Sequence, residues 1–134
     1  MKRILTAVLG LSLLTAGCSD PVAPPTPIPV APTIRETFSD TLVVQGVNSH
    51  PFSVQQVGGL KVSITSITPG AAVGLGVGTP SGGRCLANTT VTTVAGPTPQ
   101  LSGTAAITGS FCVSVYDTGG LVEPVTYTVT VLHS

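Results

Sequence analysis

The chain has 134 residues, of which 42% are hydrophobic and only 7% are charged, and five Lys and Arg balance five Asp and Glu. This length fits a single domain built around one core. Binding to nucleic acid needs several clustered basic side chains, whereas Arg35, Lys61 and Arg84 lie far apart in the sequence. The composition therefore argues against a nucleic-acid partner.

Residues 1–17 have the pattern of a secretory signal peptide. Lys2 and Arg3 precede an apolar run at residues 4–14, and two small residues then precede Cys18. The apolar run is too short to form a stable membrane span. The segment resembles the signals of bacterial lipoproteins, and this resemblance implies cleavage before Cys18 and acylation of its thiol. The alternatives are an ordinary signal peptide with an incidental cysteine and a buried N-terminal helix.

Acylation of Cys18 predicts a protein of the cell envelope that is attached to the membrane by lipid. One acyl chain binds a bilayer only marginally, but the several chains of a lipoprotein make the attachment effectively permanent. Ser19 follows the cysteine where an aspartate would favour retention in the inner membrane, so resemblance to enterobacterial lipoproteins favours the outer membrane or cell surface. Loss of Lys2 and Arg3 with the signal leaves three basic and five acidic side chains, a net charge of about −2.

Residues 18–35 combine the expected lipidated cysteine with a proline-rich tether. Proline stands at nearly every second or third position, and its ring removes the backbone donor that a helix or a central strand needs. Some fifteen residues of extended polyproline-type chain reach on the order of 45 Å. We expect a semi-rigid spacer between membrane and domain, and the alternative is a ligand for an aromatic groove of a partner protein.

Residues 36–134 predict an all-β domain, because short β-branched runs are separated by turn residues and no window sustains a helical period. Strict alternation occurs in three runs. The expected core-facing residues of these runs are Leu60, Val62, Ile64, Phe111, Val113, Val115, Tyr127, Val129 and Val131. The intervening residues, which include Cys112, Ser114, Tyr116 and Thr130, are expected to face outward. Further strands are predicted at residues 38–45, 52–57, 73–78, 84–94 and 100–108.

About eight short strands at this spacing predict an antiparallel β-sandwich or jelly-roll-like fold. The series Gly74, Gly76 and Gly78 alternates with apolar residues and no helix follows it. It therefore indicates a closely packed strand rather than a phosphate-binding loop.

The cysteine count favours one disulfide. With Cys18 assigned to lipid, Cys85 and Cys112 remain as a pair in an exported protein. Closing this loop would stabilise the domain by roughly 3.5 kcal/mol in the chain-entropy model. Two separate buried thiols or a reactive thiol are the alternatives, and a zinc site is disfavoured because the histidines show no ligand spacing.

Three segments of the domain resemble a known family. They are Leu101-Ser102-Gly103-Thr104, the strand from Gly109 to Asp117 that ends in Val115-Tyr116-Asp117, and the final strand that contains Tyr127-Thr128-Val129-Thr130-Val131. Together with the opening at residues 38–42, 52–54 and 59–65, they resemble the bacterial pre-peptidase C-terminal domain. The resemblance implies a non-catalytic β-sandwich, commonly appended to secreted enzymes and sometimes binding calcium or polymeric substrates.

The titratable residues give no support for catalysis. His50 is expected in a surface turn and His133 in a frayed terminus. A Ser-His-Asp catalytic triad could be drawn from Ser114, His50 and Asp117, but the sequence has no Gly-x-Ser-x-Gly motif around the serine. We therefore predict that the chain is not an enzyme.

Two kinds of binding stay open. Asp40, Asp117 and Glu123 could offer oxygen ligands to calcium, although no Asp-rich loop is present, and solvated loop acids are the simpler interpretation. Tyr116, expected on the outward face beside Asp117, is the predicted contact residue for a polymer or protein of the envelope or its surroundings. The predicted function is thus a lipid-anchored structural or binding module. The alternative is an accessory domain for a separate secreted hydrolase, or a small hydrolase.

Overall fold

The computed structural model describes residue 17, residues 21–26 and residues 33–134. Residues 21–26 form neither strand nor helix and are exposed. Cys18 and most of the predicted signal peptide and tether lie outside the described residues, so lipidation and the length of the spacer stay predictions. Among the residues that are described, no helix is long and apolar enough to cross a membrane.

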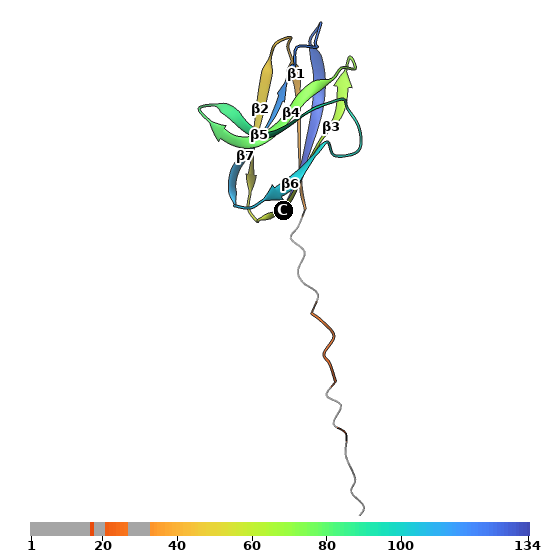
Figure 1. Cartoon of the computed structure of the whole chain (residues 1–134), viewed down its shortest axis with the longest axis vertical. Coiled ribbons are helices and arrows are strands. Elements are labelled where there is room, and N and C mark those ends of the chain that lie inside the picture. The colour runs from red at the N-terminus through yellow and green to blue at the C-terminus, as the bar shows by residue number, and fades with distance from the viewer. Residues whose placement is uncertain (1–16, 18–20, 27–32) are drawn as a thin grey trace, which may run out of the picture.

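Eight strands build the domain, and the described residues contain no helix (Figure 1). The strands are β1 (Ile34–Leu42), β2 (Val47–Val54), β3 (Gly58–Thr68), β4 (Val73–Ser81), β5 (Arg84–Thr93), β6 (Leu101–Ala105), β7 (Gly109–Tyr116) and β8 (Val125–His133).

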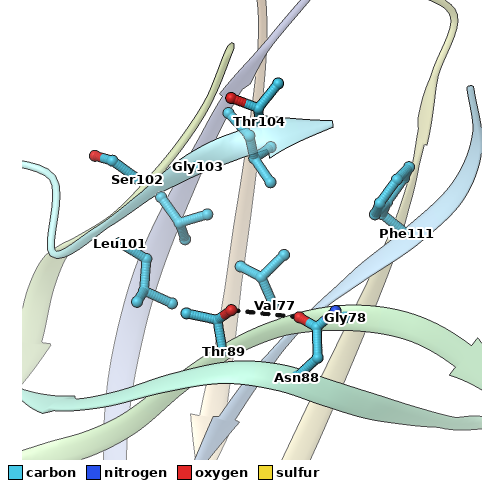
Figure 2. A pocket seen from close by; sticks show the side chains of 11 residues that line it. Val77, Gly78, Asn88, Thr89, Leu101, Ser102, Gly103, Thr104 and Phe111 are labelled. Carbon is cyan, nitrogen blue, oxygen red and sulfur yellow. Dashed lines mark hydrogen bonds between the residues drawn. The ribbon is translucent and has the colours of Figure 1, made fainter. Parts of the chain in front are cut away.

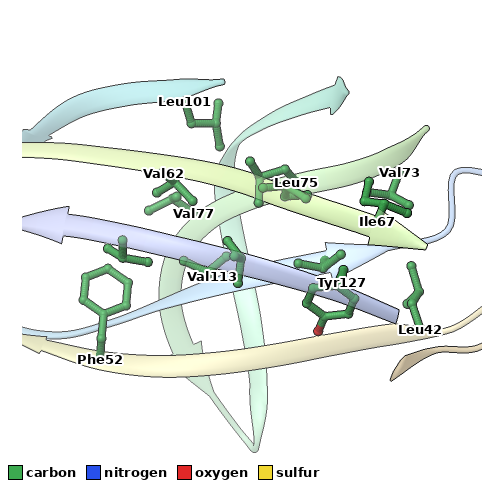
Figure 3. Close-up of a cluster of buried hydrophobic side chains, with 14 of the residues drawn as sticks. Leu42, Phe52, Val62, Ile67, Val73, Leu75, Val77, Leu101, Val113 and Tyr127 are labelled. Carbon is green, nitrogen blue, oxygen red and sulfur yellow. The ribbon is translucent and has the colours of Figure 1, made fainter. Parts of the chain in front are cut away.

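The strands form two four-stranded sheets in which every paired neighbour is antiparallel. One sheet has the order β1-β8-β3-β6 and the other has the order β2-β7-β4-β5. A single cluster of buried apolar side chains from both sheets lies between them (Figure 3). The predicted all-β sandwich is confirmed.

The core consists mainly of β-branched and leucine side chains that alternate along each strand, as half-buried strands require. Eight of the nine predicted core residues are buried, and Phe111 is partly buried against the core. Tyr127 is the largest fully buried side chain, and Figure 3 shows it near Leu42 at one end of the cluster.

The structure corrects the start of the second strand. The sequence predicts a surface turn at His50 and a strand at residues 52–57, whereas β2 begins at Val47 and contains His50 and Pro51. Proline has no amide proton to donate, but β2 is the edge strand of its sheet and therefore tolerates it. The strand thus continues through His50 and Pro51, where the sequence predicts a turn.

The β4–β5 hairpin bends over the outer face of its sheet. Gly82 and Gly83 form a two-residue turn with positive φ at both positions, the conformation that tight hairpins favour. The predicted disulfide joins Cys85 of β5 to Cys112 of β7 with a Cα–Cα distance of 5.7 Å, although β4 lies between these strands. Strands two places apart in a flat sheet are about 9.5 Å apart, so the hairpin must curl toward β7.

Gly76 and Gly78 make this close approach possible, as expected for a closely packed strand, whereas Gly74 leaves space for the Tyr116 ring. A Cβ at Gly76 would lie 2.7 Å from the Ala87 Cβ, and one at Gly78 would overlap the Leu86 carbonyl oxygen. The hairpin therefore packs directly on the β4 backbone.

The curled hairpin also changes the exposure that the sequence predicts for the outward-facing residues of β7. Cys112 and Ser114 lie on the outer face as predicted, yet both are buried. Thr130, on the outer face of the other sheet, is buried too. It lies on β8, which has a paired strand on each side.

Candidate functional site

A cleft of about 210 Å³ opens between the two sheets, where the edge strands β5 and β6 face each other (Figure 2). Its apolar walls come from Leu60 and Val62 on β3, Val77 on β4, Leu101 on β6 and Phe111 on β7. The side chains of Asn88 and Thr89 add amide and hydroxyl groups, whereas Ser102 and Thr104 border the cleft from β6 with their side chains on the outer face. No residue that lines the cleft carries a charge.

A bulge and a glycine create this cleft. Val77 pairs with Thr89 and Gly78 pairs with Ala87, so Asn88 is an extra residue in β5. A bulge of this kind bends its strand, which turns β5 away from β6. Gly103 on β6 pairs with the buried Leu60 and therefore lies on the inner face, but it brings no side chain to the space.

Asp117 follows β7 and holds two loops together through its carboxylate. Oδ2 accepts a hydrogen bond from the Gln45 amide at 2.8 Å, and Oδ1 accepts from the amides of Gly119 at 2.8 Å and Leu121 at 3.1 Å. These bonds, that from Gln45 above all, hold the pKa of Asp117 below its usual value. The Asp117 carboxylate is thus occupied by backbone amides rather than presented to a ligand.

Tyr116, the predicted contact residue, faces outward but is only partly exposed. It pairs with Gly74 of β4, and a Cβ at Gly74 would overlap the Tyr116 ring. The ring therefore lies flat across the strand backbone in the space that the glycine leaves. This geometry makes Tyr116 a packing residue with one accessible side.

The three acids weighed as calcium ligands do not form a site. Asp40 lies in β1, Asp117 follows β7, and Glu123 is exposed in the loop before β8. Within residues 33–134 and the shorter described segments, no group of three or more His, Cys, Asp or Glu side chains could hold a metal ion.

His50 was expected in a surface turn, but the structure places it in β2 facing the other sheet. Its ring stacks on Phe38 with centroids 5.0 Å apart, and Nε2 lies 2.6 Å from the Tyr127 hydroxyl. Asn48 Nδ2 donates to the same hydroxyl at 3.0 Å, which leaves the hydroxyl proton available for donation to a neutral His50. Burial lowers the pKa of His50, while nearby Asp40 acts in the opposite direction. Burial also raises the pKa of Tyr127 to about 12.

His133 was expected in a frayed terminus, but it is the buried end of β8. Only 2% of the residue is exposed, and its Nε2 lies 2.7 Å from Glu36 Oε1 on the neighbouring strand β1. Its ring also packs near Phe52 of the opposite sheet. The three residues considered as a triad do not come together. His50 faces the core on β2, whereas Ser114 faces outward on β7 and the Asp117 carboxylate accepts hydrogen bonds from backbone amides.

Sequence reasoning missed the cleft, although one signal was present. An isolated glycine within a strand marks weakened packing or a close approach by another group, and Gly103 has this position in β6. The bulge at Asn88 has no comparable signal because nothing in the local pattern distinguishes the extra residue.

No family model matches the chain, and no curated protein matches it. The resemblance to the pre-peptidase C-terminal domain therefore stays a prediction.

Proposed function

We propose that this chain is a lipid-anchored protein of the cell envelope, acylated at Cys18, whose β-sandwich is a non-catalytic structural or ligand-binding module. The observation that carries the proposal is the basic start, short apolar run and pair of small residues directly before Cys18. Acyl chains on that thiol would hold the protein at a membrane.

The position of the first strand agrees with such an anchor. β1 begins at Ile34, which pairs with His133 at the C-terminal end of β8. The β1–β2, β3–β4 and β7–β8 loops all lie at the opposite end, where Leu42 pairs with Val125 and Thr68 with Thr126. A tether that joins the domain where β1 begins, at Ile34, would therefore present this loop-bearing end away from the membrane.

The polar contacts support a non-catalytic role. His50 is bonded to Tyr127, His133 to Glu36, and Asp117 to three backbone amides. Each of these groups stabilises the fold through a specific partner. A catalytic acid or base would instead need to reach a substrate.

Cell fractionation of a Cys18→Ser variant tests the anchor. We expect the wild-type protein in the membrane fraction with a metabolically incorporated fatty acid, and the variant without fatty acid and released from the membrane. Ser19→Ala is the matched control, because it changes the next residue but keeps the thiol. Membrane retention of Cys18→Ser without the fatty acid would refute the anchor.

Co-sedimentation with insoluble polymers tests the binding half of the proposal. Peptidoglycan, chitin, cellulose and collagen, each with and without calcium, cover neutral and charged envelope or extracellular polymers. Saturable binding to one of them would establish a recognition module, and absence of binding to all would favour the structural role.

A further inference from the structure

The cleft between β5 and β6 has the chemistry of a site for a lipid chain. We propose that it binds one alkyl chain of a neutral membrane lipid. The inference rests on the proposed function, because the anchor at Cys18 is what would bring the domain to a bilayer.

The lining of the cleft selects an uncharged, apolar occupant. Leu60, Val62, Val77, Leu101 and Phe111 form its walls, and no charged side chain lines it to pair with an ionic group. An unpaired charge is disfavoured in such surroundings. The amide of Asn88 and the hydroxyl of Thr89 suit the uncharged glycerol or ester end of a neutral lipid.

The size of the cleft favours a chain over a compact molecule. Its volume of about 210 Å³ is below the range of roughly 300–1,000 Å³ in which drug-sized ligands are enclosed. A flexible alkyl segment can occupy such a space while the rest of the lipid stays outside it.

Gly103 keeps the cleft open. It occupies an inner-face position on β6 between the buried residues Leu101 and Ala105, and a Cβ built on it meets no atom within 4 Å. A larger residue would fit there and fill the space from the side of β6. On the β6 side, the open space is therefore due to the missing side chain at Gly103.

The cleft also lies toward the membrane in the proposed orientation. Gly103 pairs with Leu60, Leu60 pairs with His133, and His133 pairs with Ile34, the first residue of β1. The four residues thus form one row across the sheet, level with the point at which the tether joins the domain. Figure 1 shows β6 at this same end of the sandwich.

An added peptide strand fits this edge less well than a lipid chain. β6 has only five residues, and beyond it the Gln100 side chain already bonds to the backbone of Ile64. Gln100 Oε1 accepts from the Ile64 amide at 2.7 Å, and Nε2 donates to the Ile64 carbonyl at 3.3 Å. A short, capped edge offers little backbone for strand addition.

Photolabelling with a neutral lipid tests the proposal. The probe is a monoacylglycerol with a diazirine in its alkyl chain, added to the full chain carrying Cys18→Ser and purified without detergent. We expect saturable labelling that peptide mass spectrometry maps to the lining strands β3, β4, β5, β6 and β7.

Three glycine variants supply the comparison. Gly103→Val places a side chain in the cleft and is expected to weaken probe binding by about tenfold. Gly59→Val is the matched control, because Gly59 is also exposed with open space at its Cβ but lies on the outer face of the neighbouring strand. Gly103→Ala, with an intermediate loss, guards against misfolding of the valine variant, and urea midpoints verify that all three variants are folded.

Several results would overturn the proposal. Labelling that does not saturate, spreads outside the cleft or persists unchanged in Gly103→Val would do so. Protection of the β6 amides by an added peptide that also abolishes labelling would indicate a peptide groove instead.

The source of the lipid is tested with wild-type protein in phosphatidylethanolamine vesicles that contain the probe. Labelling of the cleft in the wild-type protein supports binding of a free lipid. Labelling of the Cys18→Ser chain without labelling of the wild type would show that the protein's own acyl chain fills the cleft, and would overturn binding of a free lipid. Because the purified Cys18→Ser chain needs no anchor, its labelling is judged separately from the fractionation experiment.

Discussion

Gly74 and Tyr116 depend on each other at the scale of single residues. The glycine has no side chain, and the tyrosine ring covers the backbone that it exposes. Such covering of a strand glycine by an aromatic side chain keeps water from the ladder hydrogen bonds. The pair explains the partial burial of the predicted contact residue.

Gly74→Ala is expected to destabilise the domain by about 1–3 kcal/mol, because the new methyl group forces the Tyr116 ring from its position. The measurement is the free energy of unfolding in urea. In a Tyr116→Ala background the same substitution should cost almost nothing. Gly59→Ala, which meets no neighbouring atom, is the control, and an equal loss in that variant would contradict the explanation.

His50 gives the stability of the domain a dependence on pH. Because its pKa is lowered in the folded state, the unfolded chain takes up a proton below about pH 6.5 that the folded chain does not. The contribution of neutral His50 is therefore complete above pH 6.5 and is lost as the pH falls below this value.

Urea unfolding of wild type and His50→Gln between pH 7.5 and about 5 tests this dependence. The wild-type midpoint should fall more steeply with decreasing pH than that of the variant. Both proteins contain His133 and Glu36, so the difference between their profiles reports His50 alone. Parallel profiles would show that His50 titrates alike in the folded and unfolded states.

At the scale of elements, the β4–β5 hairpin shows what the sequence could and could not predict. The residue pattern predicted strands at residues 73–78 and 84–94, and the cysteine count predicted the Cys85–Cys112 pair. They did not predict that the hairpin leaves the plane of its sheet, because this bend depends on the bulge at Asn88 and on contacts with β7. The local sequence pattern indicates the periodicity of strands and the positions of turns, whereas tertiary contacts determine how strongly a strand curves.

Removing the disulfide should release this hairpin. Cys85→Ala combined with Cys112→Ala is expected to lower the free energy of unfolding by roughly 3.5 kcal/mol in the chain-entropy model. Urea unfolding measures the loss, and limited proteolysis should show earlier cleavage within residues 79–88. A reducing agent should weaken wild type similarly and leave the double variant unchanged. Unchanged stability of the double variant would contradict this account.

The contacts of the two histidines could not be predicted from the sequence. The sequence predicts that both histidines are exposed, because His50 precedes Pro51 and His133 lies next to the C-terminal residue. Their partners Tyr127 and Glu36 are 77 and 97 residues away, so no local signal could reveal the contacts. The same holds for the cleft, whose lining comes from five strands.

At the scale of the whole molecule, the sandwich is expected to fold without the tether. Every strand pairing and core contact among the described residues lies within residues 33–134. A chain that starts at residue 33 should therefore match the thermal midpoint of the Cys18→Ser chain, measured by circular dichroism. A markedly lower midpoint would mean that residues before 33 pack on the domain.

The pairing of β1 with β8 has a mechanical consequence for an anchored protein. β1 pairs with β8 along its full length from Ile34 to Leu42, and its first residue is where the tether joins. Hydrogen bonds of an antiparallel ladder run perpendicular to the strands, so a pull along β1 stretches all of them together. A force between the proposed membrane anchor and the loop-bearing end would thus load this ladder in shear, and the strand would resist as a unit instead of unzipping bond by bond.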